Sequence, residues 1–334
     1  MRLRRSDLQR PGLSRRRRGS GWSYVDTDGH PVDAETRQRI SSLVIPPAWQ
    51  DVWISPYPNG HIQAVGTDAA GRRQYLYHEQ WRLTRDELKH ARVLTLARRL
   101  PKVRQAIETD LVRPRLDRDR VLATALRMLD YGLFRSGNES YTEDNGSHGV
   151  ATLLREHVVA RRDQVAFDFP AKSGVARSLT LVDAPLADAV RALRRARTGT
   201  DRLLVYRCDR GWGEIHADTV NERFKELAGA DFTVKDLRTW RATVVAAMEF
   251  SRLEHPSTKA ARTRAERTVM EAVAQELGNT PAVARSSYVD PRVVETFGRG
   301  QTIARALSRI GTDDLTDPDV RLAVERAVIR LLQR

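Results

Sequence analysis

The most informative segment of the chain reads Gly278-Asn279-Thr280-Pro281-Ala282-Val283-Ala284-Arg285-Ser286-Ser287-Tyr288-Val289-Asp290-Pro291. Thr280 is a favoured N-cap residue and Pro281 suits the first helical position. The turn before them is therefore predicted to lead directly into a short helix that carries Tyr288. Such a helix can present a tyrosine as a nucleophile. The alternative is an ordinary half-buried packing tyrosine, and the choice depends on the rest of the chain.

The chain has 334 residues, a length that favours two domains over one. The formal net charge is +14, and arginine supplies most of the positive charge because only six lysines are present. Arginine makes planar, bidentate contacts with phosphates, so nucleic acid is the first candidate partner. The alternative is a soluble protein from an arginine-rich proteome, which charge alone does not exclude.

Several kinds of site have no sequence signal. The single cysteine, Cys208, cannot form a disulfide within the chain, which fits a reducing cytoplasm. No apolar run approaches the roughly 20 residues that cross a bilayer. Nucleotide-binding glycine motifs are missing, and the eight histidines are scattered without metal-ligand spacing. We therefore expect an intracellular, soluble protein with no cofactor, no metal and no bound nucleotide.

Composition changes along the chain predict three parts. Residues 1–20 hold eight arginines, four of them consecutive at positions 15–18, and are predicted to form a basic flexible arm. Residues 21–83 are rich in aromatic residues and turn signals, which indicates a small antiparallel sheet with one helix near residues 34–42. Residues 84–334 show helical periodicity. The expected fold class is α+β, with a small β-rich N-terminal domain and a larger, mainly helical domain.

Within the larger domain, apolar residues three or four apart predict helices at 84–108, 117–132, 147–162, 184–197, 217–228, 235–254, 259–277, 281–288 and 318–334. Two β-hairpins interrupt them. The first spans 165–181 with a polar tip at Lys172, and the second spans 203–215.

Four further residues combine with Tyr288. Arg135 directly follows a predicted helix, Lys172 occupies the first hairpin's tip, Arg238 begins another helix, and Asn279 precedes the tyrosine helix. Each alone is more often a surface residue than a catalytic one. Their order along the chain is more informative than any one of them.

This order of Arg, hairpin Lys, Leu237-Arg238-Thr239-aromatic and Tyr resembles the type IB DNA topoisomerases of the poxvirus and bacterial branch. The N-terminal half resembles that branch independently, through Ile45-Pro46-Pro47-Ala48-Trp49, a Gly-His-Ile-Gln-Ala run at 60–64 and a Gly-Arg-Arg-Gln-Tyr-Leu-Tyr-His run at 71–78. The resemblance runs from about residue 22 to residue 299.

The resemblance implies relaxation of supercoiled duplex DNA by transient cleavage of one strand, without ATP or metal. Tyr288 would form a 3′-phosphotyrosyl link, Arg135 and Arg238 would hold the non-bridging oxygens, and Lys172 would be the general acid. Asn279 stands where poxvirus enzymes carry histidine. Its amide can donate a hydrogen bond but cannot carry a proton, so it is expected only to orient and stabilise the phosphate.

The resemblance also implies residues that contact DNA without taking part in the chemistry: Gln74, Tyr75, Tyr77, Tyr141 and Lys235. A monomer associated with the nucleoid is expected, with the two domains closing around duplex DNA as a clamp. Tyr75 and Tyr77 would share one face of a strand, although ordinary sheet packing also explains them.

Two other functions stay open at this point. A tyrosine site-specific recombinase shares the Arg, Lys, Arg and Tyr set. However, recombinases usually carry histidine three residues before the second arginine, where this chain has Lys235. A non-catalytic basic DNA-binding protein is the other alternative, and it would not need all four of these residues.

Overall fold

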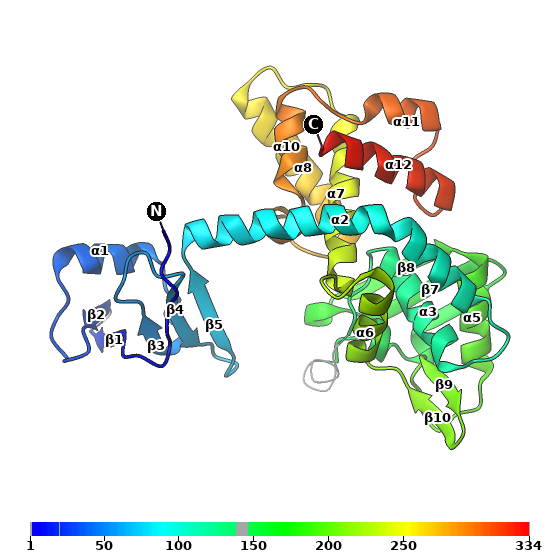
Figure 1. Ribbon diagram of the computed structural model, residues 1–334, viewed down its shortest axis with the longest axis horizontal. Helices are drawn as coiled ribbons and strands as arrows, with labels where there is room; N and C mark the ends of the chain where they lie inside the picture. The colour runs from blue at the N-terminus through cyan, green and yellow to red at the C-terminus, as the bar shows by residue number, and fades with distance from the viewer. Residues whose placement is uncertain (1, 20, 138–145, 334) are drawn as a thin grey trace. The chain divides into compact units, whose positions relative to one another are not determined.

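The computed structural model describes residues 2–19, 21–137 and 146–333, in two compact units, Met1–Lys89 and His90–Arg334 (Figure 1). The boundary lies within helix α2 (Glu79–Leu111), after residue 89 rather than after residue 83. Among the described residues, no helix combines the length and apolar character that crossing a membrane requires.

The N-terminal unit is a five-stranded antiparallel sheet with one helix. The strand order is β2-β1-β3-β4-β5, and the strands are β1 (Leu13–Arg18), β2 (Gly21–Val25), β3 (Gln50–Ile54), β4 (Ile62–Thr67) and β5 (Arg73–Tyr77). Helix α1 (Ala34–Ser42) begins at Asp33, whose side chain accepts a hydrogen bond from the Thr36 N–H. Ile40 of α1 joins Leu13, Ile54 and other apolar residues of the sheet in the core of this unit.

The prediction of a flexible basic arm is wrong for residues 13–18. These residues form β1, which pairs with β2 over its length and with β3 at its start. Contacts with other segments explain the order: the Arg15 guanidinium lies 4.1 Å from the ring of Trp22 and donates to the backbone carbonyls of Pro46 and Trp49 at 2.9 Å and 2.5 Å. An arginine run that would be solvated in isolation therefore becomes ordered on an aromatic strand.

The C-terminal unit is mainly helical. Besides α2, the helices among its described residues are α3 (Arg118–Asp130), α5 (Ala184–Arg195), α6 (Ala217–Ala228), α7 (Val234–Ser251), α8 (Lys259–Leu277), α9 (Pro281–Val283), α10 (Pro291–Gly298), α11 (Ala304–Ile310) and α12 (Pro318–Leu331). Shorter turns are η1 (Val150–Thr152), η2 (Arg155–His157), η3 (Lys172–Gly174) and the π-helical turn η4 (Ala284–Tyr288). The small sheet and large helical domain of the predicted fold class are confirmed.

Both predicted hairpins are present. Strands β7 (Gln164–Pro170) and β8 (Ala176–Val182) form the first, and β9 (Val205–Cys208) with β10 (Gly211–Glu214) forms the second. The helix predicted at 147–162 is wrong, because this segment forms η1, η2 and a third strand, β6 (Val158–Arg161), beside β7. Gly149 explains the break: a Cβ there would lie 2.4 Å from the Gly137 backbone nitrogen, so the chain passes close to another segment.

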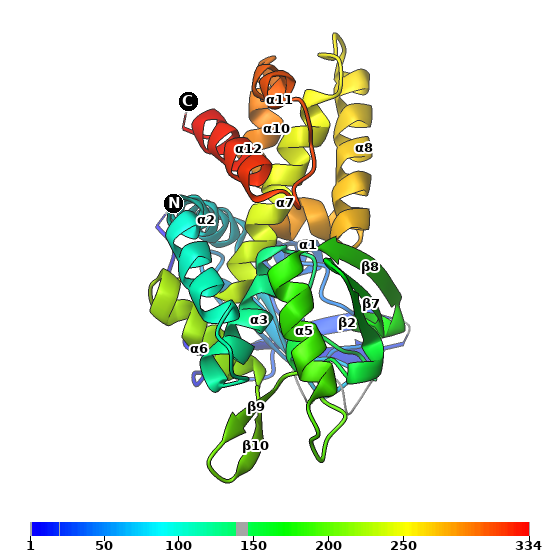
Figure 2. The same ribbon diagram turned by 90° about the vertical axis from the view of Figure 1, so that its right-hand side faces the viewer.

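Helix α7 is the central element of this unit. It contacts α3, α8, α10, α12 and η4 (Figure 2). Most of its residues are buried, including Arg238 in its second turn. The Asp236 carboxylate supports that end of the helix, because it accepts hydrogen bonds from the Thr233 backbone N–H at 2.9 Å and from the Thr233 hydroxyl at 3.2 Å. The start of α7 is thus fixed in place at the point where Arg238 projects.

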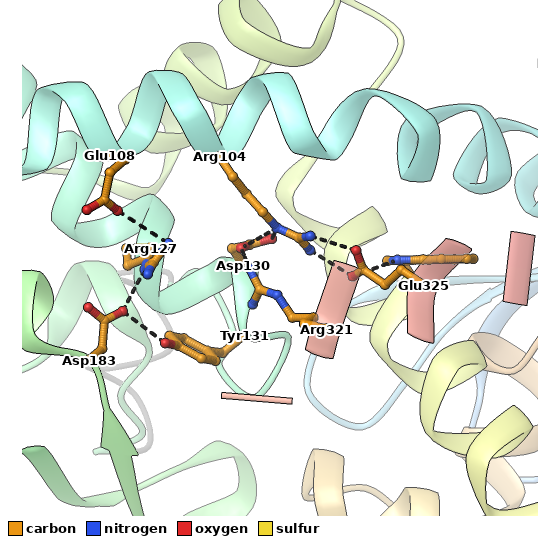
Figure 3. Close-up of polar contacts among 9 residues, drawn as sticks. Arg104, Glu108, Arg127, Asp130, Tyr131, Asp183, Arg321 and Glu325 are labelled. Carbon is orange, nitrogen blue, oxygen red and sulfur yellow. Dashed lines mark hydrogen bonds and ion pairs between the residues drawn. The ribbon is translucent and has the colours of Figure 1, made fainter. Parts of the chain in front are cut away.

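A buried ion network joins α2, α3, α7 and α12 (Figure 3). Arg104 of α2 donates to Glu325 of α12 at 2.6 and 2.8 Å and to Asp130 of α3 at 2.9 Å. Arg321 also donates to Asp130, and the Trp240 indole N–H donates to Glu325 at 3.1 Å. Asp130 ends α3 directly before the segment that carries Arg135, and Trp240 lies two residues after Arg238. The network therefore anchors both arginine-bearing segments.

Glu325→Ala is expected to lower the free energy of unfolding by about 3–5 kcal/mol, because it leaves Arg104 buried with half of its charge compensation removed. Glu325 is 5% exposed. The matched control is Glu271→Ala, which removes the partner of an exposed Arg267 on α8, a change expected to cost at most about 1 kcal/mol. Urea denaturation of both variants measures the difference. Equal stabilities would contradict the structural role of the network.

Candidate active site

Tyr288 lies at the end of a tightly fixed turn. Gly278 ends α8 with φ 64°, a left-handed conformation that glycine adopts without strain. The Thr280 side chain then accepts a hydrogen bond from the Val283 N–H, and Pro281 occupies the first helical position, as predicted. The following residues form the π-helical turn η4, and Tyr288 at its end is 5% exposed.

Arg238 is buried beside the tyrosine. Its guanidinium carbon lies 5.5 Å from the centre of the Tyr288 ring, and the residue is 4% exposed. Its Nη1 donates to the carbonyl oxygens of Gly132 and Phe134 at 3.1 and 3.2 Å, and its Nη2 donates to the Leu277 carbonyl at 2.8 Å. Arg238 therefore holds together the segments before Arg135 and before Asn279.

Arg135 and Asn279 are in direct contact. The Arg135 Nη2 donates to the Asn279 Oδ1 at 2.6 Å. The amide oxygen is thereby occupied, and the buried Nδ2 of Asn279 has no hydrogen-bond partner among the described residues. An unsatisfied buried donor costs about 1–3 kcal/mol, so this N–H is available to donate to an acceptor outside the described residues.

Lys172 lies in η3, at the tip of the hairpin formed by β7 and β8, and its side chain is exposed. A pocket of about 280 Å³ brings it together with Arg135, Lys235, Arg238 and Tyr288. Four cationic side chains and one phenol thus surround a space that suits a phosphodiester.

The positive charges in this pocket lower the pKa of Tyr288. Burial tends to raise the pKa of the Tyr288 phenol, but the positive charges of Arg238, Arg135 and Lys235 oppose burial and prevail, so the pKa lies below its ordinary value. Burial and the nearby Arg135 lower the pKa of Arg238 to about 10, which leaves it charged at neutral pH. The pocket therefore makes the phenol easier to deprotonate than a free phenol.

The residues predicted to contact DNA lie in different parts of the structure. Tyr75 and Tyr77 lie on the exposed face of β5, 38% and 42% exposed, with their rings stacked 6.0 Å apart. Gln74 alternates to the other face of this strand and donates to Asp68 at 2.9 Å. Lys235 lines the pocket. Tyr141 lies outside the described residues.

Sequence reasoning missed other residues that line the same pocket: Ser136, Gly137, Ser147 and His148. The only signal that could have found His148 is its position soon after Arg135. A single histidine among eight carries little information by itself, and the wrong helix at 147–162 placed it on a helix rather than beside Arg135.

Among the described residues, no carboxylate lines the pocket. Elsewhere in the described residues, one group of potential ligand atoms lies within 4.8 Å of one another: Asp26, Asp28 and His30. The Asp26 carboxylate accepts hydrogen bonds from the backbone N–H groups of Asp28 and His30 at 3.0 and 2.8 Å. An ordinary turn accounts for this cluster.

Comparisons with known proteins agree with the two-unit architecture. The family described as "Eukaryotic DNA topoisomerase I, catalytic core" matches residues 78–309, and "Bacterial DNA topoisomerase IB, N-terminal domain" matches residues 21–68. The DNA topoisomerase 1B of Acanthamoeba polyphaga mimivirus is 30% identical over 296 residues, which is 86% of this chain and 87% of the relative. The DNA topoisomerase 1B of vaccinia virus (strain Copenhagen) is 23% identical over 243 residues, 69% of this chain and 71% of the relative.

The match to the catalytic core covers more than half of the chain and defines a DNA topoisomerase. With the bacterial N-terminal domain and the mimivirus relative, the chain belongs to the type IB DNA topoisomerases. It is therefore an isomerase that acts on DNA and relaxes it, as the resemblance implied. The recombinase and the non-catalytic alternatives are wrong.

Proposed function

We propose that the protein relaxes supercoiled duplex DNA through a 3′-phosphotyrosyl link to Tyr288, without ATP or a metal. The observation that carries this proposal is the pocket itself, in which a phenol of lowered pKa lies beside Arg135, Lys172 and Arg238. A free phenol has a pKa near 10 and reacts slowly at neutral pH. Positive charge that stabilises the phenolate makes it a competent nucleophile.

In the cleavage step, the Tyr288 oxygen forms a bond to the phosphorus while the bond from phosphorus to the 5′-oxygen breaks. Arg135 and Arg238 stabilise the charge on the non-bridging oxygens, and the unpartnered Asn279 N–H donates to one of them. Lys172 gives a proton to the departing 5′-oxygen. The phosphotyrosine retains the energy of the diester, so the same 5′-hydroxyl can reverse the step after the DNA has rotated.

Other residues, away from the reacting phosphate, hold the DNA in place. Tyr75 and Tyr77 offer an exposed stacked pair beside Arg73, whose guanidinium lies 6.0 Å from the Tyr75 ring. This surface contacts the duplex, as does Lys235 next to the phosphate, and Gln74 and Tyr141 add to the contact. The protein acts as a monomer, and its place in the cell is the nucleoid.

The test of this function is relaxation of a negatively supercoiled plasmid by the purified protein in EDTA, with no nucleotide added. We expect complete relaxation through a ladder of topoisomers, together with a protein–DNA adduct that detergent traps. Strict dependence on Mg²⁺ or ATP would contradict the proposal, because neither takes part in the chemistry described above.

Lys172→Ala is expected to slow single-turnover cleavage of ordinary DNA by roughly 10²–10⁴, the usual contribution of a general acid. A substrate with a 5′-thiolate leaving group needs no proton, so it should restore a rate near that of the unmodified protein. Lys102→Ala, which removes an exposed lysine of α2, is the control and should cleave both substrates normally. A Lys172→Ala variant that the thiolate does not rescue would remove Lys172 from the acid role.

A further inference from the structure

We propose that His148 is a further catalytic residue, the base that accepts the proton of Tyr288 when the phenol attacks. This inference rests on the proposed function, since it concerns the same cleavage step. The cleavage chemistry above assigns an acid for the leaving group but no acceptor for the phenol proton. His148 lines the pocket that contains Tyr288.

The backbone around His148 is fixed to the Arg135 segment. The Val150 N–H donates to the Arg135 carbonyl at 2.9 Å, and the Ala151 N–H donates to the Ser136 carbonyl at 2.8 Å. On the other side, the His148 N–H donates to the carbonyl of Pro170 at 2.8 Å, two residues before Lys172. The imidazole is therefore anchored between the two segments that carry Arg135 and Lys172.

The ring's hydrogen bond sets its tautomer. The His148 Nδ1 lies 2.6 Å from the carbonyl oxygen of Thr152. A carbonyl oxygen only accepts hydrogen bonds, so Nδ1 carries the proton and the neutral ring keeps its lone pair on Nε2. His157 packs against the ring at 4.5 Å between centroids and 68° between planes, which holds its orientation. An imidazole oriented through Nδ1–H has the arrangement that a general base requires.

Among the described residues that line the pocket, no other side chain offers a comparable base. Besides His148, the titratable side chains among the described lining residues are the arginines and lysines at positions 135, 172, 235 and 238 and the phenol of Tyr288 itself. The remaining polar side chains lining it are the hydroxyls of Ser136 and Ser147, which are weak bases. Burial and the neighbouring His148 lower the pKa of His157, so the residue packed against His148 favours its neutral form. The described lining of the pocket is therefore rich in positive charge and contains one imidazole, whose Nε2 is the candidate proton acceptor.

Nε2 of His148 takes the phenol proton as the bond from the Tyr288 oxygen to phosphorus forms, while Lys172 protonates the 5′-oxygen as its bond to phosphorus breaks. In religation both protons return. The lowered pKa of Tyr288 makes transfer to an imidazole less unfavourable than it would be from an ordinary phenol.

The test uses His148→Asn in the full chain. The Asn amide nitrogen takes the place of Nδ1 and can keep the bond to Thr152, but nothing replaces Nε2. We expect single-turnover cleavage at neutral pH to fall about 10²-fold or more, with DNA affinity and melting temperature unchanged. Unlike Lys172→Ala, this variant should not be rescued by a 5′-thiolate substrate, because the missing group acts on the nucleophile. His255→Asn, which alters an exposed histidine outside the pocket, is the control.

A second variant keeps the test decisive if His148→Asn folds poorly. In His148→Ala, free imidazole added to the buffer should restore cleavage in a saturable manner. Cleavage at the normal rate by either folded variant would overturn the proposal and leave His148 a purely structural role. Rescue of His148→Asn by the 5′-thiolate would also overturn it. If the unmodified protein forms no covalent adduct in the same assay, the proposed function fails instead.

Discussion

Tyr288→Phe is expected to abolish both plasmid relaxation and the detergent-trapped covalent adduct. The change removes one oxygen atom, the atom that forms the bond to phosphorus, and leaves the ring in place beside Arg238. Among the described residues, the other polar side chains that line the pocket are cations, two serines and an imidazole, and none of them is a phenol. Noncovalent DNA binding should persist, because the arginines and lysines that contact phosphates are intact.

The matched control is Tyr206→Phe, which removes a hydroxyl from a half-buried tyrosine of β9 in the same unit. This variant should relax DNA at the normal rate. Residual relaxation by Tyr288→Phe above the background of a mock purification would mean that another residue carries the covalent link.

Arg238→Ala is expected to slow cleavage by roughly 10³–10⁵, the range associated with an arginine on a transferring phosphoryl group. Two effects combine. The variant loses a charge that stabilises the non-bridging oxygens, and it loses the hydrogen bonds to the carbonyls of Gly132, Phe134 and Leu277 that hold the site together. Arg267→Ala, on the exposed face of α8, is the control and should cleave normally.

Arg238→Ala should also change the pH dependence. The Arg238 charge is the main influence that lowers the pKa of Tyr288 against the effect of burial. Its removal leaves burial to raise that pKa, so the phenolate forms only at higher pH and the cleavage profile shifts in the alkaline direction. A profile that stays in place, or a loss smaller than tenfold, would show that Arg238 supports the fold rather than the charge at the phosphate.

The parts of the site predictable from sequence were those with local signals. Thr280 and Pro281 specify a helix start without help from the rest of the chain, and the alternation of Phe167 and Phe169 specifies a strand that ends near Lys172. The positions of Arg135 and Arg238 relative to Tyr288 depended on their order along the chain. Only the four residues taken together are informative, because each arginine alone is one of many arginines in the chain.

What sequence could not predict depends on contacts between distant segments. The helical spacing at 147–162 is real, but Gly149 packs on Gly137 and the backbone pairs with carbonyls near Arg135, so the helix does not form. The strand at 13–18 depends in the same way on the residues that contact Arg15. The ion network joins residues up to 221 positions apart, and no local pattern indicates which of many arginines contacts Glu325.

The central claim is that Tyr288 bonds covalently to the 3′-phosphate of a cleaved DNA strand. The most direct measurement is mass spectrometry of the adduct formed on a DNA duplex, trapped with detergent and digested with protease and nuclease. We predict one modified peptide, with a nucleotide attached through its 3′-phosphate to Tyr288. Attachment to any other residue, or through a 5′-phosphate, would contradict the account.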